Sequence, residues 1–204
     1  ARALAPKPLL LLMDEPFSNL DQELREHMGQ EVSDMLKVND ITCVMVTHDQ
    51  NDAFALGDRV GVMADGAIIQ WDTPYNLYHQ PDTHFVADFI GNGIFLPGTV
   101  SAPTRVATAL GDLQSDTDLK MDADSPIEVL IRPDDVVHDP DGPIRATVRR
   151  RAFKGAEIMY TLRTAEGITL LALFPSHANF EIGDAVSVRL AVDHLVVFER
   201  EAEA

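Results

Sequence analysis

Residues 9–16 read Leu-Leu-Leu-Leu-Met-Asp-Glu-Pro, a run of aliphatic side chains that ends in two adjacent carboxylates. A short apolar run bounded by Pro8 and Pro16 predicts a fully buried strand of a parallel sheet. Asp14 and Glu15 follow at the carboxyl end of that strand, which is where open α/β sheets bind their ligands. The alternative is a core strand followed by a solvated acidic turn, and this segment alone does not separate the two.

A second apolar run, residues 41–46, ends in a similar way. Its sequence Ile-Thr-Cys-Val-Met-Val precedes Thr47-His48-Asp49, so a histidine stands at the end of a second predicted strand. The segment between the two runs carries apolar residues at helical spacing, namely Leu24, Met28, Val32, Met35 and Leu36. Strand, helix and strand in this length predict a βαβ unit with a right-handed crossover, which brings Glu15 and His48 to one edge of a sheet.

These segments resemble the ATPase domain of ATP-binding cassette (ABC) transporters. Residues 9–16 resemble its Walker B strand, Ser18-Asn19-Leu20-Asp21 its D-loop, and Thr47-His48-Asp49-Gln50 the segment of its switch histidine, in the order and spacing of that family. Residues 1–5 are similar to the end of the helix that follows the signature motif. Four ordered matches in about fifty residues form a specific signal, unlike a single short motif.

The resemblance implies a role for three side chains. Asp14 holds Mg²⁺ through a bound water, Glu15 activates the attacking water, and His48 donates to the terminal phosphate of ATP and helps to hold Glu15. Adjacent strand residues point to opposite sides, so Asp14 and Glu15 are expected to divide the work. Without the flanking motifs, the better interpretations are a solvated carboxylate for Glu15 and a structural histidine for His48.

The loop after Glu15 has two compatible interpretations. The resemblance implies that Ser18, Asn19 and Asp21 face a second ATPase subunit. The residues alone predict turn formation and a helix cap, with Asp21 capping a helix over Gln22–Val38 and Leu24 as its first inward residue. Both roles can hold at once.

Two motifs of the family do not occur in these 204 residues. One is the phosphate-binding Gly-x-x-x-x-Gly-Lys-Ser/Thr, and the other is the signature Leu-Ser-Gly-Gly-Gln. The resemblance therefore implies the C-terminal part of a longer ATPase. The chain alone is expected neither to bind ATP and Mg²⁺ tightly nor to hydrolyse ATP.

Composition excludes some functions. The formal net charge is −17, from 16 basic and 33 acidic residues, which disfavours nucleic acid as a partner. The single cysteine, Cys43, excludes an intramolecular disulfide framework and fits a reducing cytosol. No apolar stretch reaches the length of a bilayer span, so membrane association is expected to run through a partner.

The remainder of residues 1–92 is expected to alternate short helices and strands. Asp65-Gly66, between apolar runs at residues 60–64 and 67–71, predicts a type I′ hairpin. Helices are expected at residues 50–56, after the cap Thr73-Pro74 and after residues 81–83, before Gly91-Asn92-Gly93 ends the pattern.

From residue 93 onward the pattern changes to short β-rich runs separated by turn residues. Strands are expected at residues 94–100, 105–110, 127–131, 144–153, 158–163, 168–174, 185–192 and 195–198, with an acidic surface loop at 112–125. Such a pattern predicts a small barrel or sandwich. It resembles the accessory TOBE-type β-domain of bacterial importers, chiefly through Ile131-Arg132-Pro133-Asp134-Asp135.

The expected fold class is thus α/β, the C-terminal part of a P-loop ATPase domain over residues 1–92, followed by an all-β OB-like barrel domain over 93–204. The resemblance implies the ATP-hydrolysing subunit of a bacterial ABC importer. Its expected partners are a second ATPase subunit in a homodimer, two permease subunits and, indirectly, a solute-binding protein. It would lie peripherally at the cytoplasmic face of the inner membrane.

For the imported solute, residues 95–100 resemble ferric-iron importers first and polyamine importers second. The alternative function is a stand-alone regulatory or dimerisation module, in which the β-domain binds a small ligand or a partner protein.

Overall fold

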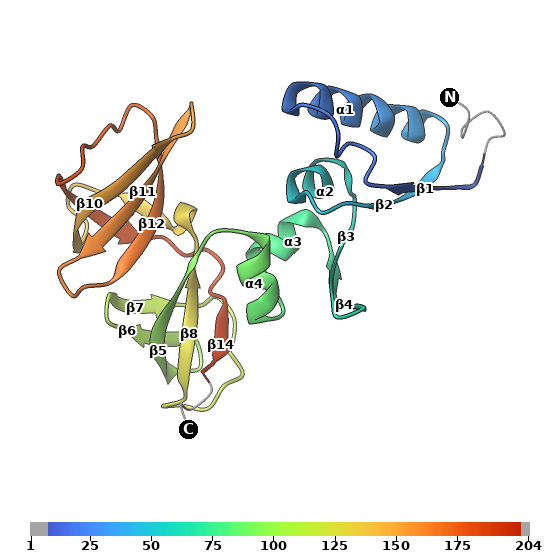
Figure 1. Cartoon of the computed structure of the whole chain (residues 1–204). Helices are drawn as coiled ribbons and strands as arrows, with labels where there is room; N and C mark the ends of the chain where they lie inside the picture. The colour runs from blue at the N-terminus through green and yellow to red at the C-terminus, as the bar shows by residue number, and fades with distance from the viewer. Residues whose placement is uncertain (1–7, 201–204) are drawn as a thin grey trace. The chain divides into compact units, whose positions relative to one another are not determined.

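The computed structural model describes residues 8–200, so the resemblance noted for residues 1–5 lies outside the described part of the chain. The chain divides into two compact units, Ala1–Tyr78 and His79–Ala204 (Figure 1). Most of the described strands belong to antiparallel sheets of the second unit. Within residues 8–200, a complete α/β sheet of the P-loop type is not evident, and no helix is long and apolar enough to cross a bilayer.

The first unit is built on a βαβ pair. β1 (Leu10–Asp14) and β2 (Thr42–Val46) pair in parallel, from Leu10 opposite Thr42 to Asp14 opposite Val46. The connection contains α1 (Gln22–Val38), which lies along one side of the two strands (Figure 1). The helix bounds and the parallel pairing confirm the expectation for this segment.

The expectation of fully buried strands is wrong for this chain. Leu10 and Leu12 of β1 are exposed, Leu12 by 70%, and so is Val44 of β2. Residues between them, such as Leu11 and Cys43, are half-buried. A parallel strand becomes fully buried only when both faces of its sheet are covered. Here α1 covers one face, so only every second side chain is shielded.

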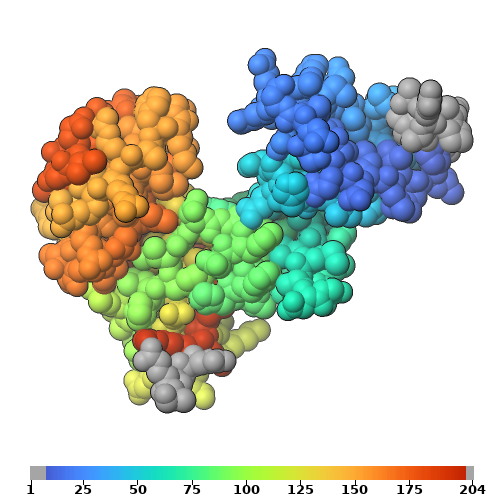
Figure 2. Space-filling model, viewed as in Figure 1, coloured from blue at the N-terminus to red at the C-terminus, as the bar shows by residue number. Residues whose placement is uncertain are grey.

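Helix α1 is likewise only partly buried. Leu24, expected as its first inward residue, is 42% exposed, whereas Gly29 is buried. A Cβ at Gly29 would lie 3.1 Å from Cδ1 of Leu56, so the absence of a side chain allows α2 (Gln50–Leu56) to pack closely. The blue residues of α1 accordingly form part of the visible surface of this unit in Figure 2.

The first unit continues with a hairpin of β3 (Val60–Ala64) and β4 (Ala67–Asp72), then α3 (Pro74–His79). Asp65 and Gly66 have φ angles of 50° and 79°. Two consecutive left-handed residues are what a type I′ turn requires, so the predicted hairpin turn is confirmed.

The second unit begins with α4 and a five-stranded antiparallel sheet. Thr83 caps α4 (His84–Ile90), its hydroxyl oxygen accepting from the Val86 N–H at 3.2 Å. The sheet has the order β14-β8-β5-β6-β7. Its strands are β5 (Ile94–Ala102), β6 (Arg105–Thr108), β7 (Gly111–Gln114), β8 (Pro126–Ile131) and β14 (Val197–Glu199).

A second antiparallel sheet has the order β12-β11-β10-β13-β9. Its strands are β9 (Val136–His138), β10 (Ile144–Phe153), β11 (Glu157–Thr164), β12 (Thr169–Pro175) and β13 (Ala185–Leu190). The edge strands β12 and β9 approach each other, so this sheet curls into a nearly closed barrel. The OB-like character expected for the C-terminal part is thereby supported.

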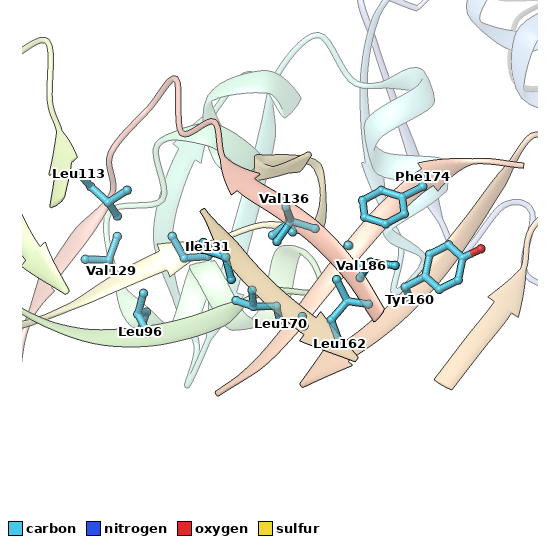
Figure 3. Packing of buried hydrophobic residues seen from close by; sticks show 14 of the residues in the cluster. Leu96, Leu113, Val129, Ile131, Val136, Tyr160, Leu162, Leu170, Phe174 and Val186 are labelled. Carbon is cyan, nitrogen blue, oxygen red and sulfur yellow. The ribbon is translucent and has the colours of Figure 1, made fainter. Parts of the chain in front are cut away.

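One hydrophobic core serves both sheets of the second unit. Figure 3 shows Leu96 and Val129 of the first sheet in continuous packing, through Ile131 and Val136, with Leu162 and Tyr160 of the barrel. The loop expected at residues 112–125 is partly wrong, because β7 occupies its start and contributes Leu113 to this core.

Candidate functional site

The carboxyl end of β1 places Glu15 at the start of a turn. The Glu15 N–H donates to the Val46 carbonyl at 2.8 Å, which extends the pairing with β2 by one residue. Its φ angle is 44°, a left-handed conformation that is uncommon for a residue with a side chain. The turn, rather than strand alternation, therefore determines where the carboxylate of Glu15 lies, while Asp14 remains the exposed last residue of β1.

The segment Ser18–Asp21 is held by its own backbone. The Ser18 hydroxyl donates to the Glu15 carbonyl at 3.0 Å, and the Leu20 N–H donates to the carbonyl of the buried Phe17 at 3.1 Å. Asp21 then caps α1, its carboxylate accepting from the Leu24 N–H at 3.0 Å. The predicted cap is confirmed, and Ser18 and Asn19 stand exposed beside Glu15 in sequence.

His48 comes from the end of β2. The Asp49 N–H donates to the Thr47 hydroxyl at 3.0 Å, and the Asp49 carboxylate caps α2 by accepting from the Asn51 N–H at 2.8 Å. These contacts fix the chain on both sides of His48. Its Nδ1 lies 2.7 Å from Oε1 of Glu15, a hydrogen-bond distance. The structure thus brings together the acid and the imidazole singled out from the sequence.

The local charges affect how these groups titrate. The hydrogen bond and the negative charge of Glu15 raise the pKa of His48, whose side chain is 79% exposed. The Asn51 N–H, aided by the Arg25 guanidinium, lowers the pKa of Asp49 against the effect of burial. Burial, followed by the nearby Asp49, raises the pKa of Asp52. The contact therefore favours a proton on Nδ1 of His48, facing Oε1 of Glu15.

The residues present fit Mg²⁺ only as a cation held chiefly by a nucleotide. Within residues 8–200, no group of three or more His, Cys, Asp or Glu side chains forms a protein cage for a metal ion. Asp14 offers one exposed carboxylate at the end of β1. Mg²⁺ typically uses one or two carboxylates together with water and substrate phosphates, which matches a single protein ligand.

Sequence reasoning missed Arg25. Its guanidinium forms an ion pair with the carboxylate of Asp49, 24 residues away, and donates to the Leu20 carbonyl at 3.4 Å. An arginine on the first turn of a mostly exposed helix carries no pattern that separates it from a solvated residue. The role of Arg25 becomes visible only in the structure, where α1 lies beside the segment that follows β2 and Arg25 meets Asp49.

The motif at residues 131–135 has a structural role in the second unit. Pro133, Asp134 and Asp135 form a short 3₁₀ helix, and the Asp135 carboxylate accepts from the Arg132 N–H at 2.7 Å. The buried guanidinium of Arg132 donates to the Gly91 carbonyl at 2.8 Å. This motif therefore ties the end of α4 to the strands of the same unit.

The sequence matches known proteins over nearly its whole length. A family model described as the TOBE domain matches residues 129–198. The spermidine/putrescine import ATP-binding protein PotA of Borreliella afzelii is 34% identical over 203 residues, which cover 98% of this chain and 57% of that protein. The Fe(3+) ions import ATP-binding protein FbpC 2 of Pectobacterium atrosepticum is 35% identical, covering 92% of this chain and 55% of that protein.

A third relative is named for another solute. The osmoprotective compounds uptake ATP-binding protein GgtA of Synechocystis is 33% identical, covering 99% of this chain and 59% of that protein. The chain thus spans between 55% and 59% of the length of these curated relatives. A solved structure of the cytoplasmic molybdate-binding protein ModG matches 52% of this chain and 96% of that chain, with a TM-score of 0.45 and 13% identity.

Proposed function

The chain belongs to the family of ABC importer ATP-binding subunits, with a TOBE domain in its second half, and on this premise we propose that it supplies the catalytic acid and the switch histidine of an ATP-hydrolysing importer subunit. The observation that carries the proposal is the 2.7 Å contact between Nδ1 of His48 and Oε1 of Glu15. It joins an acid and an imidazole at the ends of two parallel strands, where ligands of α/β sheets bind.

In this proposal Glu15 is the general base. Its carboxylate accepts a proton from the water that attacks the terminal phosphate of ATP. His48 donates through Nδ1 to Oε1 of Glu15 and so fixes the orientation of that carboxylate. When the ring is protonated, Nε2 also carries a proton and is the side that donates to the phosphate. The exposure of His48 in this chain is compatible with contact to a nucleotide bound above the strand ends.

Asp14 is the residue proposed to hold Mg²⁺. The metal, when bound, neutralises charge on the phosphates of the nucleotide. The Asp14 carboxylate has the hard oxygen donors that this cation prefers, and its position next to Glu15 in sequence puts both at the same strand end. ATP and Mg²⁺ are therefore the proposed ligands of a subunit that combines this chain with a phosphate-binding loop.

Ser18, Asn19 and Asp21 are proposed to face a second ATPase subunit. Ser18 and Asn19 are exposed and are held in a defined turn, which suits a contact surface. Asp21 also caps α1, so the same exposed position serves the helix cap and the proposed contact with the second subunit. The resulting homodimer would act with two permease subunits, and indirectly with a solute-binding protein, at the cytoplasmic face of the inner membrane.

For the β-rich part we propose a regulatory role over residues 93–204, with the ATPase part over 1–92. The relatives are named for polyamines, ferric ions and osmoprotective compounds. We propose ferric ions as the first candidate solute to test and polyamines as the second, since both occur among these names.

The test compares two proteins. A subunit that joins this chain to the Walker A and signature segments of a relative is expected to bind and hydrolyse Mg-ATP, whereas the 204-residue chain alone is expected not to hydrolyse it. Failure of the joined, folded subunit to bind Mg-ATP would overturn the proposed function.

A further inference from the structure

Arg25 connects two segments that carry the candidate site. It lies on the first turn of α1, and its side chain is 24% exposed. One end of its guanidinium forms an ion pair with the Asp49 carboxylate, next to His48. The other end donates to the carbonyl of Leu20, within the segment that follows Glu15, at 3.4 Å. A single side chain thus contacts both segments that flank the pair of Glu15 and His48.

The planar guanidinium is suited to this position. Its fork of N–H donors can contact two acceptors in different directions at once, whereas a lysine ammonium acts as a compact point charge. The Nε of Arg25 is buried and has no hydrogen-bond acceptor among the described residues. A buried N–H left unpaired lowers stability, so it offsets part of what the contacts with Asp49 and Leu20 contribute.

The ion pair of Arg25 with Asp49 also affects which carboxylate is available to His48. Four ionisable side chains of this unit interact electrostatically with the imidazole: Glu15, Asp49, Asp52 and Arg25. Asp49 is adjacent to His48 in sequence and could compete with Glu15 for its Nδ1. The guanidinium of Arg25 and the Asn51 N–H occupy the two oxygens of Asp49. Both oxygens of Asp49 thus already accept from other donors, whereas Oε1 of Glu15 meets Nδ1 of His48 at 2.7 Å.

We propose that Arg25 is a positioning residue, which holds the segment after Glu15 and the segment of His48 together so that His48 pairs with Glu15 rather than with Asp49. The inference rests on the proposed function for its catalytic meaning, but the positioning itself is a property of this chain. Arg25 touches neither the water nor the nucleotide in this scheme. It acts through Leu20 and Asp49.

The tautomer of His48 reports the pairing without any nucleotide. A neutral imidazole that donates from Nδ1 to a carboxylate carries its proton on Nδ1, whereas an unpaired imidazole in water favours the proton on Nε2. Long-range ¹H–¹⁵N spectra of the 204-residue chain, recorded where the ring is neutral, distinguish the two forms. The wild-type chain is expected to show the Nδ1–H form.

Arg25→Met is expected to reduce the Nδ1–H fraction about threefold or more, because the imidazole loses its fixed partner. Arg59→Met is the matched control, since Arg59 pairs with Asp72 in the same unit, away from the site. This control is expected to leave the tautomer of His48 unchanged. An unchanged Nδ1–H fraction in Arg25→Met would overturn the proposal.

Arg25→Lys keeps the test decisive if Arg25→Met disturbs the fold of the first unit. Lysine retains the charge but not the two-ended contact, so a partial fall in the Nδ1–H fraction is expected, and no fall would overturn the proposal. Because the readout needs no ATP, a joined subunit without ATPase activity would overturn the proposed function while leaving this result intact. Conversely, if a joined subunit carrying Arg25→Met hydrolyses ATP and keeps the wild-type tautomer of His48, the positioning role is overturned while the proposed function stands.

Discussion

Nδ1 of His48 lies 2.7 Å from Oε1 of Glu15, although 33 residues separate them in the sequence. The contact exists because β1 and β2 pair in parallel and end at the same level, Asp14 opposite Val46. Glu15 lies just after β1, where its N–H donates to the Val46 carbonyl. His48 lies just after β2, between Thr47 and Asp49, which are joined by a hydrogen bond. The arrangement of the backbone therefore brings Glu15 and His48 together, and their contact can be tested in this chain without a nucleotide.

The first prediction concerns the titration of His48. Glu15 raises the pKa of His48 by hydrogen bonding and by charge, so Glu15→Gln is expected to lower the NMR titration midpoint of His48 toward the ordinary value of about 6.5. The midpoint is expected to fall because the carboxylate stabilises the protonated imidazole in the wild type. This stabilisation disappears as pH rises through the raised pKa of His48. Glu23→Gln, on α1, serves as the control. Equal midpoints in the wild type and Glu15→Gln would refute the pairing.

The second prediction concerns stability and pH in the second unit. Burial, only partly offset by the Arg132 N–H, raises the pKa of Asp135 to about 6. The folded chain then binds this proton more tightly than the unfolded chain does. The contribution of Asp135 to the free energy of unfolding is therefore expected to fall as pH rises from 3.8 to about 6.

Asp135→Asn is expected to flatten this dependence. The raised pKa corresponds to at most about 3 kcal/mol, which solvent screening of the partly exposed carboxyl reduces to about 1–2 kcal/mol. Urea unfolding of the wild type and Asp135→Asn at several pH values measures the difference. Asp141→Asn, an exposed turn residue, is the control. Parallel pH curves for the wild type and Asp135→Asn would contradict the assignment.

The third prediction concerns a close approach of two backbone segments. A Cβ on Gly142 would lie 2.5 Å from the carbonyl oxygen of Val188 in β13, and backbone atoms cannot move aside as a flexible side chain can. Gly142→Ala is expected to lower the free energy of unfolding by about 1–3 kcal/mol. Gly155→Ala has open space but a φ of 90°, so backbone conformation alone makes it costly, by about 1 kcal/mol. Denaturation measurements that rank Gly155→Ala as the costlier variant would count against the close approach.

The fourth prediction tests the exposed face of β1 and β2. Leu12 is 70% exposed, so Leu12→Asn is expected to change the free energy of unfolding of the 204-residue chain by less than about 0.5 kcal/mol. Leu77→Ala removes a fully buried side chain of the same unit and is expected to cost about 2–5 kcal/mol. Fluorescence of the single tryptophan, Trp71, follows both unfolding reactions. A large loss in Leu12→Asn would show that this face is covered in solution.

Local signals predicted much of the chain. The helix at Gln22–Val38 follows from apolar periodicity and from the capping Asp21, and the Asp65-Gly66 turn follows from its requirement for left-handed backbone. The helix at Gln50–Leu56 is also expected from the sequence, but its cap, Asp49, is known only from the structure. The pairing of Glu15 with His48 could be anticipated because parallel strands end at one edge.

Other features depend on contacts that no local pattern records. The short strands β7 and β9 carry too few alternating apolar residues to stand out from loops. The four leucines of residues 9–12 indicate a strand, but not how many of its faces are covered. Arg25 gains its role only through Asp49, 24 residues away.

The most direct test of the central claim is ATP turnover by the joined subunit carrying Glu15→Gln. A general base contributes a factor of about 10²–10⁴ to the rate. We therefore expect turnover to fall by at least about a hundredfold while Mg-ATP binding is retained, and the control Glu23→Gln to turn over ATP normally. Wild-type turnover in Glu15→Gln would contradict the assignment of Glu15 as the base.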